Sequence, residues 1–252
     1  MRRHLSVLAL WARGTLGWVL AVLAAAAAAE AALFGRVLMG MEEPGSIDDL
    51  LAASGVYWVC AIAFLLVMAL LICGGCEFQG SRLCYTLRRL SIREEATVLW
   101  QAGYNVVCLL LFWAVQAAVM LGLCLWYAGT VDPACVSGQT VFLAFYRIGL
   151  LHGLLPLEDT FLYIRNIVFL AALGLGAASF PYFRRRGSRG GVVFPVTGWV
   201  ISTFAETSIR PSGYLVISVV AILGPVLDGF RLAQNWEGGV PDEKEPDAEQ
   251  AD

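Results

Sequence analysis

One carboxylic acid lies inside a long apolar segment of the sequence. Glu30 follows six consecutive alanines, Ala24 to Ala29, within the apolar stretch from Leu16 to Met41. An ionisable side chain at such a place is a candidate for function, because it can contact a polar substrate or pair with another helix. Arg36 comes six residues later and therefore falls on a different helical face. We take Glu30 as a candidate intramembrane polar site.

The residue types that most enzymes and metal sites use are scarce. Lys244 is the single lysine among the 17 basic residues and no glycine-rich loop precedes it, so the chain has no P-loop. Only two histidines are present, and neither H-E-x-x-H nor G-x-S-x-G occurs. Cys73 and Cys76 have C-x-x-C spacing without a second pair, which favours buried free thiols over zinc. We expect no catalytic residue, no metal and no cofactor, and hence no enzyme.

The composition identifies lipid as the solvent for most side chains. Hydrophobic residues make up 59% of the 252 residues and charged residues 15%. Soluble chains have about 45–50% apolar and about 25% charged residues. This excludes a soluble enzyme, a nucleic-acid-binding module and a disordered regulator, and it predicts an integral membrane protein with no nucleic acid partner.

Apolar stretches of membrane-spanning length predict an all-α, polytopic helix bundle, since a helix needs about 20 apolar residues to cross. Residues 1–236 are expected to form one domain with six transmembrane helices, at about 16–41, 51–75, 104–128, 161–183, 192–207 and 213–231. Residues 141–157 are broken by Arg147 and Pro156, so they should dip into the membrane and return, or lie at its outer interface. Asp159 is expected to cap the 161–183 helix, and Pro181 to mark its end.

The arginines predict the orientation. They gather before the first span, after the second and after the 161–183 span, whereas 42–49 and 129–140 contain no lysine or arginine. The positive-inside rule then places both termini in the cytoplasm. The segment 237–252 has seven acids and one lysine, and it is expected to be a disordered cytoplasmic tail. A cleaved signal peptide over 2–32 is the competing interpretation of the basic start.

The segment between the second and third spans predicts a short amphipathic helix on the cytoplasmic side. Its leucines recur at helical spacing on one face, at Leu83, Leu87 and Leu90. Its arginines line a different face, at Arg82, Arg89 and Arg93. One interpretation is an interfacial helix whose arginines contact anionic lipid headgroups. The other is a lever that takes up motion from a protein partner.

A second helix should follow this one at once. Ser91 and Glu94 have the spacing of a capping box, which predicts a helix from Ile92 onward. No glycine or proline interrupts it before Gly103, so it should continue into the third span after projecting about 18 Å beyond the membrane.

Two stretches have small residues at four-residue spacing, Gly17-x3-Ala21-x3-Ala25 and Gly174-x3-Ala178. Such patterns let transmembrane helices approach closely. They predict a tight helix bundle or a subunit interface.

The run Tyr85-Thr86-Leu87-Arg88-Arg89-Leu90-Ser91-Ile92-Arg93-Glu94-Glu95 resembles a loop of the membrane-spanning permease subunits of bacterial type-2 ABC exporters. Those permeases often carry a "TLRRLPIS"-like phrase between their second and third of six spans. The resemblance implies that this segment couples to a separate ATP-binding cassette subunit through Arg82, Leu83, Leu87, Arg88, Arg89, Leu90, Ser91 and Glu94. Ser91 stands where the family often has proline, and an insertion like 141–157 is not general in the family.

The sequence thus predicts a permease subunit of an ABC-type exporter in the bacterial cell membrane. Its expected partners are the ATP-binding subunit, a second permease copy or paralogue, and membrane lipid. The alternative is a non-transporting membrane scaffold or assembly protein, whose arginine-rich loop binds lipid or a protein partner. A membrane enzyme comes third, because the usual nucleophiles and ligands are missing.

Overall fold

The structure, a computed structural model, describes residues 2–40, 46–74, 94–131, 148–155, 160–185 and 193–205, with a few separate positions between 223 and 234. The elements formed in the six ranges are all helices, which confirms the all-α fold class for this part of the chain. They are α1 (Arg2–Gly40), α2 (Ile47–Ser54), α3 (Val56–Gly74), α5 (Glu94–Thr130), α7 (Gly149–Leu154), α8 (Thr160–Arg185) and α9 (Val193–Ala205).

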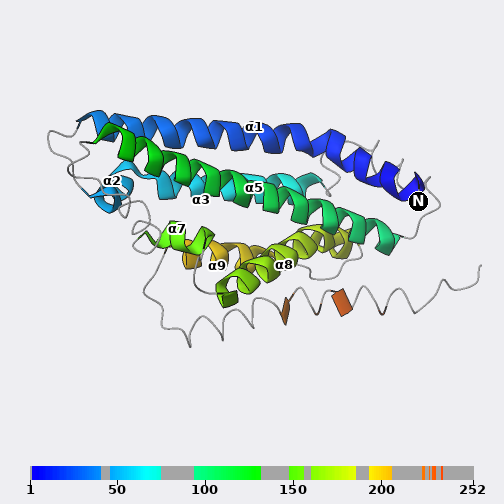
Figure 1. Cartoon of the computed structure of the whole chain (residues 1–252). Coiled ribbons are helices and arrows are strands. Elements are labelled where there is room, and N and C mark those ends of the chain that lie inside the picture. The colour runs from blue at the N-terminus through cyan, green and yellow to red at the C-terminus, as the bar shows by residue number, and fades with distance from the viewer. Residues whose placement is uncertain are drawn as a thin grey trace, which may run out of the picture.

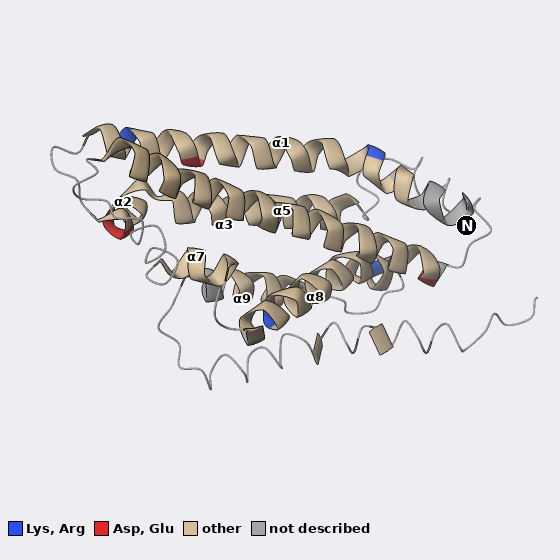
Figure 2. Ribbon diagram, viewed as in Figure 1, with Lys and Arg blue, Asp and Glu red and all other residues tan. Residues whose placement is uncertain are grey.

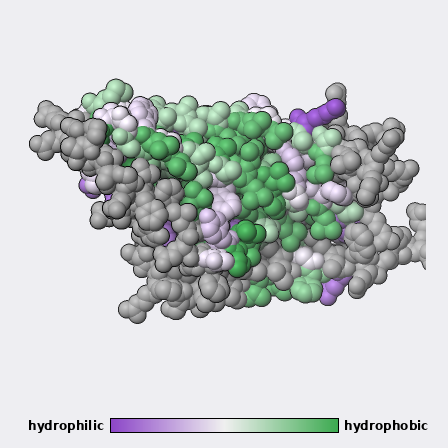
Figure 3. All heavy atoms as spheres, viewed as in Figure 1, coloured by the Kyte–Doolittle hydropathy of each residue, from purple (hydrophilic) through white to green (hydrophobic). Residues whose placement is uncertain are grey.

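Four of these helices, α1, α3, α5 and α8, are long and apolar enough to cross a membrane. Their charged residues lie mostly toward the helix ends (Figure 2), and apolar side chains cover much of the middle of the bundle (Figure 3). These features are those of a helical membrane protein. The helix α9 has 13 residues, or about 20 Å, against about 30 Å for the hydrocarbon core of a bilayer. A full crossing over 192–207 therefore stays a prediction. Most of 213–231 lies outside the described residues, so a crossing there stays a prediction as well.

The long helices run side by side and define two ends of the bundle (Figure 1). The starts of α1 and α5 and the end of α8 lie at one end, which we call the α5-start end. The short helices α2 and α7 lie at the other, the α2–α7 end. Helix α5 packs most extensively on α8, and α1 packs on both α3 and α5. Helix α5 is therefore central to the bundle.

The span predicted over 51–75 is wrong at its start, because a turn at Gly55 separates α2 from α3. Gly55 has φ 71°, in the left-handed region that residues with a Cβ avoid. Before it, the Ser46 hydroxyl accepts a hydrogen bond from the Asp49 backbone N–H at 3.2 Å and caps α2. Helix α2 is thus a separate element, and the membrane-length helix is the 19-residue α3.

The predicted end of the 161–183 helix at Pro181 is also wrong. Helix α8 continues to Arg185 with Pro181 inside it. A proline in a helix interior costs about 3 kcal/mol, because a backbone hydrogen bond is lost. The last turn offsets this cost by packing: Tyr182 and Phe183 are buried, and the Tyr182 hydroxyl donates to Glu95 Oε1 of α5 at 3.3 Å.

The small-residue pattern in α8 produces the close approach that was predicted, whereas the one in α1 does not within this chain. A Cβ built on Gly174 would lie 2.5 Å from Val106 Cγ2 of α5, so only glycine fits there. The Asn105 amide uses this proximity and donates to the Gly174 carbonyl at 3.2 Å. On α1, by contrast, Gly17, Ala21 and Ala25 are exposed.

Candidate functional site

The buried polar centre of the bundle is a pair formed by Glu30 of α1 and Gln116 of α5. Both side chains are enclosed, with 0% and 1% of their surface exposed. Gln116 Nε2 donates a hydrogen bond to Glu30 Oε1 at 2.9 Å. Of the two sequence alternatives for Glu30, pairing with another helix is the one that the structure shows. Arg36 is exposed, as expected for a residue on a different face.

The pair leaves two oxygens unused. Within the described ranges, Glu30 Oε2 and Gln116 Oε1 have no hydrogen-bond partner, although both are buried. An ionised carboxylate and an amide oxygen both only accept, so they cannot satisfy each other. A neutral carboxylic acid can donate its O–H to the amide oxygen and complete the pair. The arrangement therefore fits an uncharged Glu30 that ties α1 to α5.

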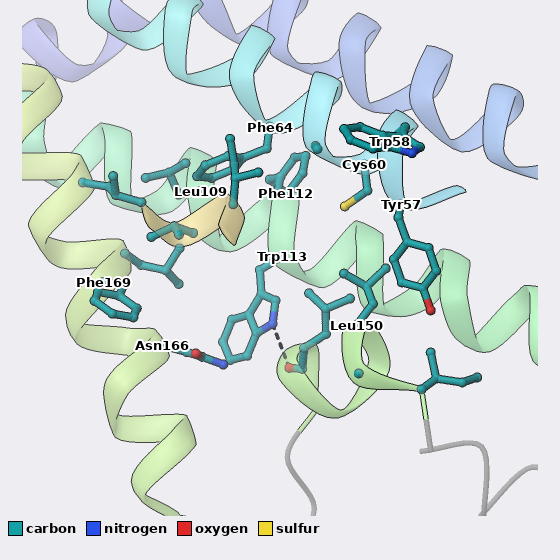
Figure 4. Close-up of a pocket in the computed structure, with 18 of the residues that line it drawn as sticks. Tyr57, Trp58, Cys60, Phe64, Leu109, Phe112, Trp113, Leu150, Asn166 and Phe169 are labelled. Atoms are coloured by element: carbon teal, nitrogen blue, oxygen red, sulfur yellow. Dashed lines mark hydrogen bonds between the residues drawn. The ribbon is translucent and has the colours of Figure 1, made fainter. Parts of the chain in front are cut away.

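A cavity of about 530 Å³ opens between α3, α5, α7, α8 and α9. Figure 4 shows the Trp113 indole reaching from α5 into the space that α7 and α8 border. Its apolar lining comes mainly from the long helices and includes Trp58, Ala61, Phe64, Leu109, Phe112, Phe169, Leu170 and Leu173. Its polar lining is Asp48, Tyr57, Cys60 and Asn166. No lysine, arginine or histidine stands among the described residues that line it.

Two hydrogen bonds hold α7 as one wall of this cavity. Trp113 Nε1 of α5 donates to the Leu154 carbonyl at 2.8 Å (Figure 4). Asn166 Nδ2 of α8 donates to the Gly153 carbonyl, also at 2.8 Å. These bonds satisfy carbonyls at the end of α7 that its own backbone does not use. The shape of the cavity therefore depends on a short helix anchored from two long ones.

Cys60 of α3 is the one described cysteine that lines the cavity. The thiols of Cys60, Cys73, Cys108 and Cys124 are all free. No group of metal-binding side chains occurs within the ranges that the structure describes.

The predicted coupling residues from Arg82 to Ser91 lie outside the described residues, as do the predicted cap and helix start at Ile92. Of Glu94 only the backbone is described, as the first residue of α5. The helix is seen to continue unbroken past Gly103 into the predicted span, as expected. The re-entrant segment is described only over 148–155, where it contains α7.

Three amide side chains that join separate helices were not predicted from the sequence. Gln116 pairs with Glu30, Asn105 bridges α5 to α8, and Asn166 anchors α7. The signal was present, because each is an uncharged polar residue inside an apolar stretch of membrane-spanning length. A buried amide needs partners as much as a charge does.

Comparisons with known protein families, with curated proteins and with solved structures found no match. What the chain does is therefore inferred from its own residues and geometry.

Proposed function

We propose that this chain is the permease subunit of an ABC-type exporter and moves a substrate across the bacterial cell membrane, driven by a separate ATP-binding subunit. The observation that carries the proposal is the length of α5, 37 residues from Glu94 to Thr130. About 20 residues cross a bilayer, so several turns project beyond it. These turns begin directly after the arginine-rich segment that resembles a coupling helix. A displacement applied there is carried across the membrane by one continuous helix.

Contacts between α5 and α8 support a lever that moves more than one helix. Near the α5-start end, Tyr182 donates to Glu95. Two to three turns further along α5, Asn105 donates to the Gly174 carbonyl, at the close helix crossing. Because these contacts join the two helices at separate levels, movement of α5 is passed to α8.

The proposal includes six spans with both termini in the cytoplasm. Five arginines of the described helices lie toward the α5-start end, namely Arg2, Arg3, Arg13, Arg184 and Arg185, against Arg36 and Arg165 toward the α2–α7 end. The acidic Asp48 and Asp49 begin α2 at the α2–α7 end. This distribution supports a cytoplasmic α5-start end by the positive-inside rule. An ATP-binding subunit would then find the arginine-rich segment on its own side of the membrane.

A second permease copy is the remaining part of the proposal. Gly17, Ala21 and Ala25 are exposed and give α1 a thin outer face. Small residues on a lipid-facing helix allow close approach of another helix. This face supports an assembly in which substrate passes between two bundles.

The test is co-purification with an ATP-binding subunit encoded beside this chain. We expect wild type to retain that subunit, and Leu87→Asp and Leu90→Asp to lose it. The two leucines are proposed to bind in an apolar groove of the ATP-binding subunit, where an aspartate would be unfavourable. Ala52→Asp is the matched control: it adds the same charge at an exposed position of α2, at the opposite end. If both leucine variants keep assembly and ATPase coupling as the control does, the lever is wrong and a scaffold is favoured.

A further inference from the structure

The cavity beside α7 changes in polarity along the bundle. On α3, Tyr57 lines it near the helix start and Phe64 lines it seven residues later. Seven helical residues span about 10 Å. Helix α3 runs away from the α2–α7 end, so Tyr57 lies at that end and Phe64 lies deeper (Figures 1 and 4). Asn166 of α8 lies across Trp113 and Leu150 from Tyr57 (Figure 4), and its amide already donates to the Gly153 carbonyl.

We propose that this cavity binds a single-chain amphiphile whose hydrogen-bonding head carries no negative charge. The apolar chain would lie between α3, α5 and α8, and the head would lie beside Tyr57, at the end where Asp48 also lines the cavity. The proposal does not depend on the exporter function, because a scaffold could hold the same ligand. The cavity would be a small-molecule site, whereas the proposed exporter function needs a protein contact at the other end of the bundle.

The size and lining of the cavity suit such a ligand. Its volume of about 530 Å³ falls within the about 300–1,000 Å³ typical of small-molecule sites. Such sites are mostly apolar and aromatic with a few polar groups that fix orientation, which describes this lining. With no basic side chain among its described lining residues, the cavity offers no ion pair to an anionic head.

The opening of the cavity points to the membrane as the source of the ligand. Trp58 lines the cavity and is 75% exposed, on a helix that is apolar enough to cross the membrane. Its place, three residues into α3, suits the interface between headgroups and hydrocarbon, where tryptophan is enriched. An amphiphile in the bilayer therefore has its head at the level of Tyr57 and its chain at the level of Phe64.

The test is photolabelling of the full chain in phosphatidylcholine nanodiscs. The probe is a medium-chain monoacylglycerol with a diazirine in the middle of its chain, and labelled peptides are mapped by mass spectrometry. We expect label on the α3, α5 and α8 residues that line the cavity, and competition by the unlabelled monoacylglycerol. Label spread over the exposed faces of the helices, without competition, would overturn the proposal.

Two substitutions on α3 give a matched pair for this experiment. Ala61 lines the cavity, so Ala61→Trp fills it and should reduce labelling about tenfold or more. Ala69 is exposed and is not among the lining residues, so Ala69→Trp should label as wild type does. Equal labelling of two well-folded variants, checked by gel filtration and thermal unfolding, would show that the cavity is not the site.

The head is tested separately. Tyr57→Phe removes one hydroxyl, and we expect about three- to tenfold weaker binding of the monoacylglycerol, the worth of one hydrogen bond. An alkane diazirine of equal chain length should bind to wild type and Tyr57→Phe alike. A sulfate-headed probe that labels the cavity as strongly as the monoacylglycerol would refute a head without negative charge.

Discussion

The Glu30–Gln116 pair shows how one amide makes a carboxylic acid tolerable inside an apolar bundle. A buried carboxylate without a cation carries a large desolvation cost, whereas a neutral acid and an amide can exchange two hydrogen bonds. Gln116 already donates one of these at 2.9 Å. The pair joins α1 to α5 without placing a fixed charge in the membrane.

We predict that the hydrogen bonds between Glu30 and Gln116 stabilise the protein and that a negative charge on Glu30 is not needed for this. Gln116→Leu leaves a buried acid without its partner and should lower the free energy of unfolding by about 1–3 kcal/mol. Glu30→Gln keeps an uncharged partner of similar size and should cost less. Thermal unfolding in detergent compares the two variants.

Equal losses from Gln116→Leu and Glu30→Gln would contradict a neutral pair, because an amide at position 30 keeps both a donor and an acceptor for Gln116. The double variant Glu30→Leu/Gln116→Leu is an additional control. It should lose less free energy of unfolding than the single variants Glu30→Leu and Gln116→Leu lose together. Each single variant leaves one buried polar group without a partner, whereas the double variant leaves none.

Among the helices, the close crossing of α5 and α8 depends on a glycine, Gly174, which has no side chain. Gly174 lets the backbone of α8 approach Val106, and the Asn105 amide spans the remaining gap. The pattern Gly174-x3-Ala178 predicted close approach, and both residues are buried at this interface.

Gly174→Ala should therefore destabilise the bundle by about 1–3 kcal/mol, the usual cost of overpacking. The added methyl group would meet Val106 Cγ2 at 2.5 Å and the Val106 backbone nitrogen at 3.1 Å. Gly122→Ala on α5 is the control, because its Cβ has no neighbour within 4 Å. That variant should be neutral or stabilising, since alanine favours helix more than glycine does. Thermal unfolding of the two variants decides, and a loss in Gly122→Ala alone would be inconsistent with the crossing.

Helix ends in this bundle depend on tertiary packing as well as on residue type. Gly55 and Pro181 are both residues that commonly end helices, yet only Gly55 does so here. At Gly55 the backbone takes a positive φ, which glycine adopts without steric cost. At Pro181 the following turn is held by the buried Tyr182 and Phe183, and this packing outweighs the lost hydrogen bond.

At the scale of the whole molecule, the proposed orientation makes opposite predictions for the two ends of the bundle. With all native cysteines replaced, Ala52→Cys on α2 should react with a membrane-impermeant maleimide in intact cells. In a second variant that keeps only Cys73, an exposed thiol near the end of α3, labelling should require permeabilised cells. Mass shift of the purified protein measures both reactions. If Cys73 is labelled in intact cells and Ala52→Cys is not, the orientation is the opposite of the one proposed.

Composition and local sequence pattern are enough to predict a lipid environment and most of the local structure. The 59% hydrophobic residues indicate lipid, and stretches of about 20 apolar residues predict helices long enough to cross. These are properties of composition and of neighbours in the chain, so they can be read without knowing the fold. The start of α3 and the end of α8 were the local features that the sequence pattern misplaced.

Which polar groups meet depends on how the helices pack against one another. Glu30 and Gln116 are 86 positions apart, and Asn105 and Gly174 are 69 apart. Their pairing depends on how each helix is rotated and where it crosses its neighbours, which the periodicity of a single helix does not specify. The cavity between α3, α5 and α8 arises in the same way, from helix packing around the short, anchored α7.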